Sequence, residues 1–298
     1  MYSIIQKRNI WLAISGILFA AAAVALAIWG FKFGIDFTGG SFMEVRFLNS
    51  RPNVEEAQKV LADLNLGSLI AQPAGEKDMA LRFQETSEEK HQEILSKLKI
   101  LAGNGNAVEE LKFDSVGPSI GAELKRKSVY AIFFVIIAIV LYISWVFRKV
   151  SKPVSSWKYG IAALVAMLHD VIITLGVFSV FGKFYGVEIS ASFVAAVLTV
   201  VGYSVHDTIV VFDRIRENLP KSHEDFGGTV NMSLNQTLGR SISTSFTVIL
   251  TLLAIIIFGG VSIRVFASAL AIGIFAGTYS SIFVASPLLV VWEKWRKQ

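Results

Sequence analysis

The chain has 298 residues, of which 53% are hydrophobic and 17% charged, and it carries a formal net charge of +5. The apolar fraction is above that of an average soluble domain, and the charged fraction is below it, which argues against a wholly soluble protein. The absence of cysteine excludes disulfides and thiolate metal sites. Charged residues are sparse after residue 128, whereas residues 44–127 have an ordinary soluble composition. We therefore expect a membrane protein with one inserted soluble domain.

Six apolar runs are long enough to cross a bilayer, which takes about 20 residues. They lie at residues 10–30, 128–147, 158–181, 188–212, 241–260 and 265–291. Very short gaps follow the third and fifth runs and predict tight antiparallel hairpins. The first run follows Lys7 and Arg8. It is too long for a signal peptide and lacks a convincing cleavage pattern, so we expect it to be retained as the first helix.

Basic residues predict the orientation of these helices. Most of those beside the runs fall on one side, which is assigned to the cytoplasm: Lys7, Arg8, Arg148, Lys149, Lys152, Lys158, Arg214, Arg216, Lys221, Lys294, Arg296 and Lys297. The opposite short loops hold only Lys183 and Arg264. Both termini are therefore predicted to be cytoplasmic, and we interpret the positive charge as a signal of membrane orientation rather than of nucleic-acid binding. The predicted parts are residues 1–30 (first helix), 31–127 (extracytoplasmic domain) and 128–298 (helices 2–6).

Residues 31–127 alternate between strand and helix patterns. Strands are predicted at 41–48, 68–72, 79–84 and 107–117, and helices at 53–64 and 86–101. Capping boxes are expected at Asn53 with Glu56 and at Thr86 with Glu89. The order β-α-β-β-α-β predicts a ferredoxin-like α+β fold. The domain shows no catalytic set, and His91, on a Glu-rich helix, is expected to be solvated.

Four ionisable side chains lie deep in apolar runs: His169, Asp170, His206 and Asp207. At about 1.5 Å per residue, Asp207 lies roughly 9 Å inside Asp213, too deep for a short side chain to reach water. Such residues are costly in hydrocarbon and mark ion pathways, or they make structural hydrogen bonds between helices.

The fifth run carries a polar stripe, because its start places one guanidinium and four hydroxyls on one helical face: Arg240, Ser243, Thr244, Thr247 and Thr251. On the fourth run, Tyr203 and Ser204 share the face of Asp207. The two faces predict one polar seam, although such hydroxyls also bond back to their own helix. Burial disfavours a charged carboxylate and a nearby Arg favours it, so an Arg that approaches and withdraws would drive proton release and uptake. The sequence has no P-loop, which points to an ion gradient as the energy source.

Several motifs resemble those of the SecD/SecF family of protein-export membrane proteins, within the RND superfamily. "GIDFTGG" (34–40) is similar to the signature that the family shares. Three further segments resemble the third, fourth and fifth helices of its SecF members: "ALVAMLHDVIITLG" (163–176), "VGYSVHDTIVVFDRIREN" (201–218) and "NQTLGRSISTSFT" (235–247). The resemblance covers nearly the whole chain.

The resemblance implies a transport subunit rather than an enzyme, with no cofactor or metal. Such a subunit partners SecD and the Sec translocon channel with its accessory subunits, and it uses the proton motive force to help export unfolded polypeptide across the cytoplasmic membrane. The family's proton-carrying Asp falls on Asp207, its essential Arg on Arg240, and a second carboxylate on Asp170. His206 departs from the Asn of many relatives. It either joins the relay or packs beside Gly202, and its face, about 100° from that of Asp207, favours packing.

The signature "GIDFTGG" is expected to shape the exit from the first helix, with Gly34, Gly39 and Gly40 permitting tight turns. Asp36 caps a turn or contacts SecD, and the sequence leaves both open. Two other functions also remain open: an RND-type drug or lipid exporter, and a scaffold that stabilises the translocon without needing Asp207. The sequence does not distinguish protons from sodium ions, although a lone Asp–Arg pair favours protons.

Overall fold

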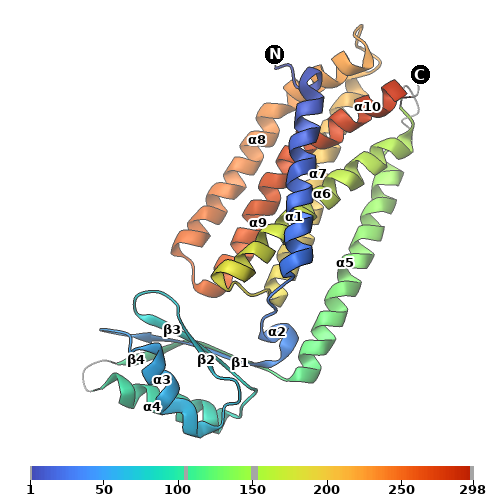
Figure 1. Ribbon diagram of the computed structural model, residues 1–298. Helices are drawn as coiled ribbons and strands as arrows, with labels where there is room; N and C mark the ends of the chain where they lie inside the picture. Colours follow the sequence, from blue (N-terminus) through green and yellow to red (C-terminus); the bar gives the residue numbers. More distant parts are fainter. Residues whose placement is uncertain (1, 104–106, 149–153, 296–298) are drawn as a thin grey trace. The chain divides into compact units, whose positions relative to one another are not determined.

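The computed structural model describes residues 2–103, 107–148 and 154–295, and the chain divides into two compact units. One unit comprises residues 1–32 with 130–298, and the other comprises residues 33–129. Figure 1 colours the chain along its length. Four of the residues used to predict the orientation lie outside the described ranges: Lys149, Lys152, Arg296 and Lys297.

Six helices in the described ranges are long and apolar enough to span a membrane, as the sequence predicts. They are α1 (Arg8–Trp29), α5 (Pro118–Val146), α6 (Ser156–Tyr185), α7 (Ala191–Asn218), α8 (Phe226–Phe258) and α9 (Val261–Ser280). A single π-helical stretch, Ser281–Ala285, joins α9 to α10 (Ser286–Trp295), so these elements form one long span. The short links from α6 to α7 and from α8 to α9 confirm the two predicted hairpins.

Two helices begin well before their apolar runs. The helix α5 starts at Pro118, a residue whose fixed φ and missing N–H suit the first helical position. The helix α8 starts at Phe226, because the Asp225 carboxylate accepts a hydrogen bond from the backbone N–H of Gly228 at 2.7 Å and caps the helix. An apolar run predicts only the part of a helix that can lie in the membrane. The polar first turns of the helix lie outside the run and are not predicted by it.

Glycines let the helices of the bundle approach closely. A Cβ atom at Gly176 on α6 would lie 2.6 Å from Cα of Ala22 on α1, and one at Gly273 on α9 would lie 2.2 Å from Cγ2 of Val200 on α7. Small residues at helix interfaces are a common route to tight packing in membranes, where van der Waals contact replaces the hydrophobic effect. These glycines thereby bring α6 close to α1 and α9 close to α7.

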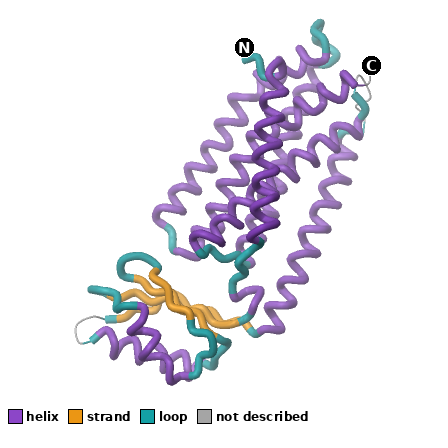
Figure 2. The backbone as a smooth tube through the Cα atoms, in the orientation of Figure 1, coloured by secondary structure: helices purple, strands orange, loops and turns teal. Residues whose placement is uncertain are grey.

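The unit of residues 33–129 is a small antiparallel sheet with helices on one face (Figure 2). Its main elements are β1 (Gly40–Phe47), α3 (Val54–Leu61), β2 (Ile70–Pro73), β3 (Asp78–Phe83), α4 (Glu88–Ala102) and β4 (Val108–Val116). The strand order in the sheet is β2-β3-β1-β4. Alternate residues of β1, namely Met43, Val45 and Phe47, are buried against Ile94 and Leu98 of α4.

Two local predictions for this unit differ in outcome. The capping box of Asn53 and Glu56 is present at the start of α3. The one expected at Thr86 is wrong, because the residue before α4 is Ser87 and its side chain makes no capping hydrogen bond.

The prediction that His91 is solvated is also wrong. Its side chain is buried, with Nδ1 3.0 Å from Glu88 Oε1 and Nε2 2.8 Å from Glu110 Oε2. The ring also stacks on Phe113, with ring centroids 3.7 Å apart. Because Glu110 and Phe113 belong to β4, only the folding of that strand over α4 buries the histidine.

Candidate ion site in the helix bundle

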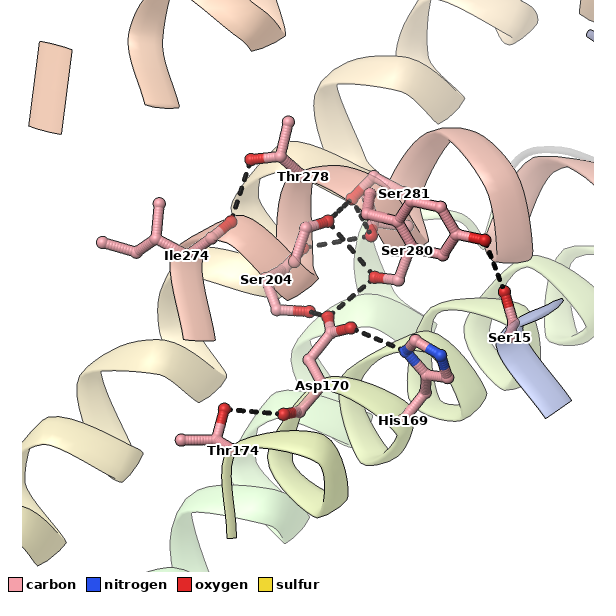
Figure 3. Close-up of polar contacts among 12 residues, drawn as sticks. Ser15, His169, Asp170, Thr174, Ser204, Ile274, Thr278, Ser280 and Ser281 are labelled. Carbon is pink, nitrogen blue, oxygen red and sulfur yellow. Dashed lines mark hydrogen bonds and ion pairs between the residues drawn. The ribbon is translucent and has the colours of Figure 1, made fainter. Parts of the chain in front are cut away.

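One buried carboxylate joins three helices. Asp170 lies on α6 with no exposed surface, and its Oδ2 accepts hydrogen bonds from Ser204 Oγ on α7 at 2.6 Å and from Ser280 Oγ on α9 at 2.7 Å. Figure 3 shows these side chains converging on Asp170. A buried carboxylate needs such donors, because hydrocarbon offers none.

A glycine and a π-helical stretch make room for this cluster. A Cβ atom at Gly277 on α9 would lie 3.2 Å from Cα of Ser204 and 3.5 Å from Oδ2 of Asp170, so a larger residue would crowd both. The π-helical stretch follows at Ser281, whose Oγ donates to the Gly277 carbonyl at 2.8 Å and lies 2.9 Å from Thr208 Oγ1. Such π-bulges are frequent at functional sites, because they re-aim side chains within a helix.

The other oxygen of Asp170 faces a buried histidine. Oδ1 lies 3.0 Å from Nδ1 of His169, whose ring is stacked between Phe19 on α1 and Tyr279 on α9. The second nitrogen, Nε2, is buried and makes no hydrogen bond with any residue that the structure describes. His169 Nε2 is therefore a buried nitrogen that could still form a hydrogen bond inside the bundle.

Asp207, on α7, is 8% exposed and faces α8. Its Oδ1 accepts a hydrogen bond from Ser241 Oγ at 2.8 Å, while Oδ2 is buried and lacks a hydrogen-bond partner among the described residues. Buried polar atoms are nearly always paired, so an unpaired carboxylate oxygen calls for an explanation, such as a bound water or ion or a role in the function of the site.

The polar face of α8 that meets α7 differs from the predicted stripe. Tyr203 Oη lies 3.1 Å from Ser245 Oγ, which in turn is hydrogen-bonded to Thr278 on α9. Ser241 and Ser245 thus make two of the hydrogen bonds that join α8 to α7. The spacing of four residues places both hydroxyls on one face, a signal that the sequence contains.

The structure does not bring the predicted stripe to Asp207. Arg240 and its four companions are all exposed in the isolated chain: Ser243, Thr244, Thr247 and Thr251. Thr244, Thr247 and Thr251 donate to backbone carbonyls of their own helix, at 2.9, 2.8 and 3.1 Å. No ion pair joins Arg240 to Asp207 within the described ranges. Of the predicted seam, Tyr203 and Ser204 point into the bundle, and Ser204 meets Asp170 rather than Asp207.

His206 and Gly202 are both exposed on α7, one turn apart, so the histidine is not buried in the bundle. In the part of the chain that the structure describes, no group of three or more His, Asp or Glu side chains gathers to hold a metal ion.

The signature "GIDFTGG" forms a short helix, α2 (Ile35–Thr38), followed by two glycines with positive φ. Gly39 and Gly40 have φ of +76° and +118°, and their Cβ positions would lie 2.8 Å from Cα of Pro118 and 2.9 Å from the Phe83 carbonyl oxygen. Only glycine tolerates both conditions. Gly34, by contrast, has a φ of −78°, which other residues adopt equally well, and Asp36 lies in the first turn of α2.

Six spanning helices with two buried carboxylates, each hydrogen-bonded to hydroxyls of a neighbouring helix, define a multi-pass membrane protein with a polar centre. Residues 96–295 match the family described as "Protein export membrane protein SecD/SecF, C-terminal", and residues 24–47 match the "SecD/SecF GG Motif". The chain belongs to the SecF family of protein translocase subunits.

Individual relatives support this assignment. The "Protein translocase subunit SecF" of Thermobaculum terrenum is 44% identical over 98% of this chain and 94% of its own length. The subunit of the same name from Anaerolinea thermophila is 38% identical over 99% of this chain and 96% of its own.

Solved SecDF structures have the same fold. The crystal structure of SecDF from Thermus thermophilus, described as a translocon-associated membrane protein, matches with a TM-score of 0.81 and 34% identity over 98% of this chain. A SecDF structure described as a super-membrane-facing form matches with a TM-score of 0.69 and 35% identity over 99% of this chain. This chain spans 39% of the length of each of those SecDF chains.

Proposed function

We propose that this chain is the SecF subunit of a SecDF complex, which uses the proton motive force to assist translocation of unfolded polypeptide through the Sec translocon across the cytoplasmic membrane. The similarity to SecF subunits and to SecDF supports this function. Because the chain corresponds to 39% of the solved SecDF chains, SecD is the partner that supplies the remainder.

The observation that carries the proposal is the unpaired Oδ2 of Asp207. Ser241 holds one oxygen of this buried carboxylate, and the other has no hydrogen-bond partner among the described residues, so the carboxylate can take up a proton and release it again. The free oxygen is where the proton would bind. A proton that crosses the membrane potential supplies about 2.3 kcal/mol per 100 mV, which needs neither a nucleotide nor a metal.

Arg240 is the proposed counter-ion. It directly precedes Ser241, so a rotation of α8 by one residue, about 100°, would bring the guanidinium to the position that Ser241 occupies. In that arrangement Arg240 would favour the charged carboxylate, and its withdrawal would favour the protonated one. The exposed position of Arg240 corresponds to the withdrawn arrangement of this cycle.

Asp170 is proposed as the second carboxylate of the relay. It accepts hydrogen bonds from Ser204 on α7, the helix that carries Asp207, and from Ser280 on α9. Thr208 on α7 is also hydrogen-bonded to Ser281, which directly follows α9. A protonation change at Asp170 would alter the hydrogen bonds that join α6 to α7 and α9, and one at Asp207 would alter the hydrogen bond that joins α7 to α8.

We further propose that residues 31–127 form a ferredoxin-like domain on the extracytoplasmic side, and that both termini are cytoplasmic. The strand order and the distribution of basic residues support this topology. The domain would contact the emerging polypeptide or the corresponding domain of SecD.

The experiment measures export in sealed membrane vesicles that contain SecD, the translocon and either the wild-type chain or Asp207→Asn. Asp207→Asn should assemble with SecD and lose the response of export to a proton gradient. Asp213→Asn, at the exposed end of the same helix, is the matched control and should retain it. A full gradient response in Asp207→Asn would leave only the scaffold function, and a response to a sodium gradient alone would replace the proton in this proposal.

A further inference from the structure

A largely apolar groove of about 610 Å³ runs between α1, α8 and α9. Its walls are mainly aromatic and branched aliphatic side chains, among them Trp11, Ile242, Phe246, Ile249, Phe275 and Phe283. Ile242, Phe246 and Phe275 are each more than half exposed, so the groove opens on the outer surface of the bundle. The surroundings of a membrane-spanning bundle at that depth are hydrocarbon.

Hydroxyls in the wall of the groove are already hydrogen-bonded within the protein. Ser245 and Thr278 are hydrogen-bonded to each other, and the hydroxyl of Tyr279 accepts a hydrogen bond from Ser15 at 3.1 Å. With these groups paired, the interior of the groove favours an apolar ligand.

One end of the groove is polar, and the hydrogen bonds of two asparagines fix its structure. Asn231 Oδ1 on α8 accepts from the backbone N–H of Ile4 at 2.9 Å, and its Nδ2 donates to the carbonyl of Tyr2 at 3.0 Å. Asn235 Nδ2 donates to the same carbonyl at 2.9 Å, and its Oδ1 accepts from the N–H of Tyr2 at 2.6 Å. The two asparagines thus clamp the segment before α1 across the end of the groove.

The ammonium group of a lysine lies at this polar end of the groove. Lys7 lines the groove and is exposed, and no acidic side chain pairs with it in the described ranges. It lies at the start of α1, where a spanning helix enters the headgroup region. An exposed ammonium there is complementary to an anionic headgroup.

The length of the groove fits one leaflet. Its wall on α8 extends from Leu238 to Ile249, which is about 16 Å at the helical rise of 1.5 Å per residue. Half of a hydrocarbon core of about 30 Å is about 15 Å. The groove therefore reaches from the headgroup level to the middle of the bilayer.

We propose that this groove binds an anionic phospholipid, with an acyl chain along α8 and the phosphate at Lys7. The acyl chain fills the apolar walls, and the charged end of the groove selects the headgroup. The site is independent of the carboxylates in the bundle and adds a lipid ligand to the function proposed above.

The test uses the full chain with Trp11 as its only tryptophan, the others being replaced by Phe, in vesicles of phosphatidylcholine and phosphatidylglycerol. Bromine on the acyl chains of one lipid at a time quenches a tryptophan in contact with that lipid. Brominated phosphatidylglycerol should quench Trp11 at about fivefold lower mole fraction than brominated phosphatidylcholine, which corresponds to about 1 kcal/mol for one basic residue at the surface. Equal quenching by the two lipids would overturn the proposal, because a groove bathed in bulk lipid or reserved for a partner helix has no headgroup preference.

Two pairs of variants separate the headgroup contact from the acyl contact. Lys7→Gln should abolish the preference, whereas Lys221→Gln, an exposed lysine outside the groove, should keep it. Ile249→Phe narrows the groove and should weaken quenching by both lipids, whereas Leu250→Phe, on the adjacent exposed face, should not. A preference that survives Lys7→Gln would contradict the assignment of the headgroup site.

Native mass spectrometry of the chain with all its tryptophans gives a second measurement that does not depend on the single-tryptophan variant. With equimolar phosphatidylglycerol and phosphatidylcholine, the wild-type chain should retain phosphatidylglycerol, and Lys7→Gln should retain neither lipid preferentially. Retention of both lipids in equal amounts by the wild-type chain would exclude a selective site.

Discussion

Ser241 Oγ donates a hydrogen bond to Asp207 Oδ1 at 2.8 Å, while Arg240, the residue before it, points away from the bundle. The two residues project about 100° apart on α8, so only one of them can face Asp207 at a time. When the neighbour is a neutral donor such as Ser241, burial favours the protonated form of the carboxylate. A guanidinium in the same place would favour the charged form. The proposed cycle alternates between these two neighbours.

Arg240→Leu is expected to abolish gradient-driven export, and Arg240→Lys to keep part of it. Lysine retains the charge but lacks the planar fork with which arginine holds a carboxylate and nearby hydroxyls together. The measurement is proton-dependent export in sealed vesicles, with Arg216→Leu at the exposed end of α7 as the control. Normal export by Arg240→Leu would eliminate the counter-ion from the mechanism.

Asp170→Ala should destabilise the bundle more than Asp170→Asn does. Alanine leaves the hydroxyls of Ser204 and Ser280 without their acceptor, at a cost of about 1–3 kcal/mol for the two bonds together on the scale measured in membrane proteins. Asparagine keeps one acceptor oxygen. The midpoint of thermal unfolding of the purified chain in detergent checks this order, and equal midpoints for the two variants would show that the hydrogen bonds contribute little.

Gly176→Ala is expected to lower the unfolding midpoint, because the added Cβ would lie 2.6 Å from Cα and 2.7 Å from the carbonyl oxygen of Ala22. Overpacking against a backbone that has to shift costs about 1–3 kcal/mol. Gly16→Ala, on the partner helix α1, meets nothing within 4 Å and should be neutral or slightly stabilising. If the two substitutions have the same effect, the close approach of α1 and α6 does not limit stability.

His91→Phe and His91→Ala should separate stacking from hydrogen bonding in the unit of residues 33–129. Phenylalanine keeps the stack on Phe113 and leaves Glu110 without its partner, which costs about 1–2 kcal/mol. Alanine loses both interactions and is expected to cost about 1 kcal/mol more, the size of an aromatic pair. Hydrogen exchange of the amides of β4 measures the difference, with the exposed Glu93→Ala as control. Unchanged protection in His91→Ala would show that the buried contacts of His91 do not stabilise the unit.

The pair of Arg46 and Asp78 predicts an acid-sensitive contribution to the same unit. Arg46 donates to both carboxylate oxygens of Asp78, at 2.7 and 2.8 Å, and these bonds hold the pKa of Asp78 below its ordinary value of 3.8. Since the pKa is lowered by folding, the stabilisation is complete above the unfolded pKa and is lost as the pH falls through the lower folded value. The pair links β1 to β3, so the protection of their amides against hydrogen exchange should fall below about pH 4 more in the wild type than in Asp78→Asn at the same pH. Identical pH profiles for the two chains would show that the pair contributes nothing.

The sequence determines the features that depend on local pattern. The lengths of the apolar runs predict the number of spanning helices, and the short gaps between runs predict the two hairpins. The capping box at Asn53 predicts the start of α3. The carboxylates of Asp170 and Asp207 were also evident, because an ionisable residue deep in an apolar run stands out without any knowledge of its neighbours.

The tertiary structure decided which faces meet. Hydroxyls occur on several sides of α8 where its apolar run begins, at Ser241, Ser243, Thr244 and Ser245, so the periodicity of the sequence does not fix which side turns toward α7. That rotation is set by close packing with other helices, and it turned Ser241 rather than Arg240 toward Asp207. The burial of His91 under β4 and the clamp of Asn231 on the segment before α1 have the same origin. Each joins residues distant in the chain through contacts that exist only once the elements have packed.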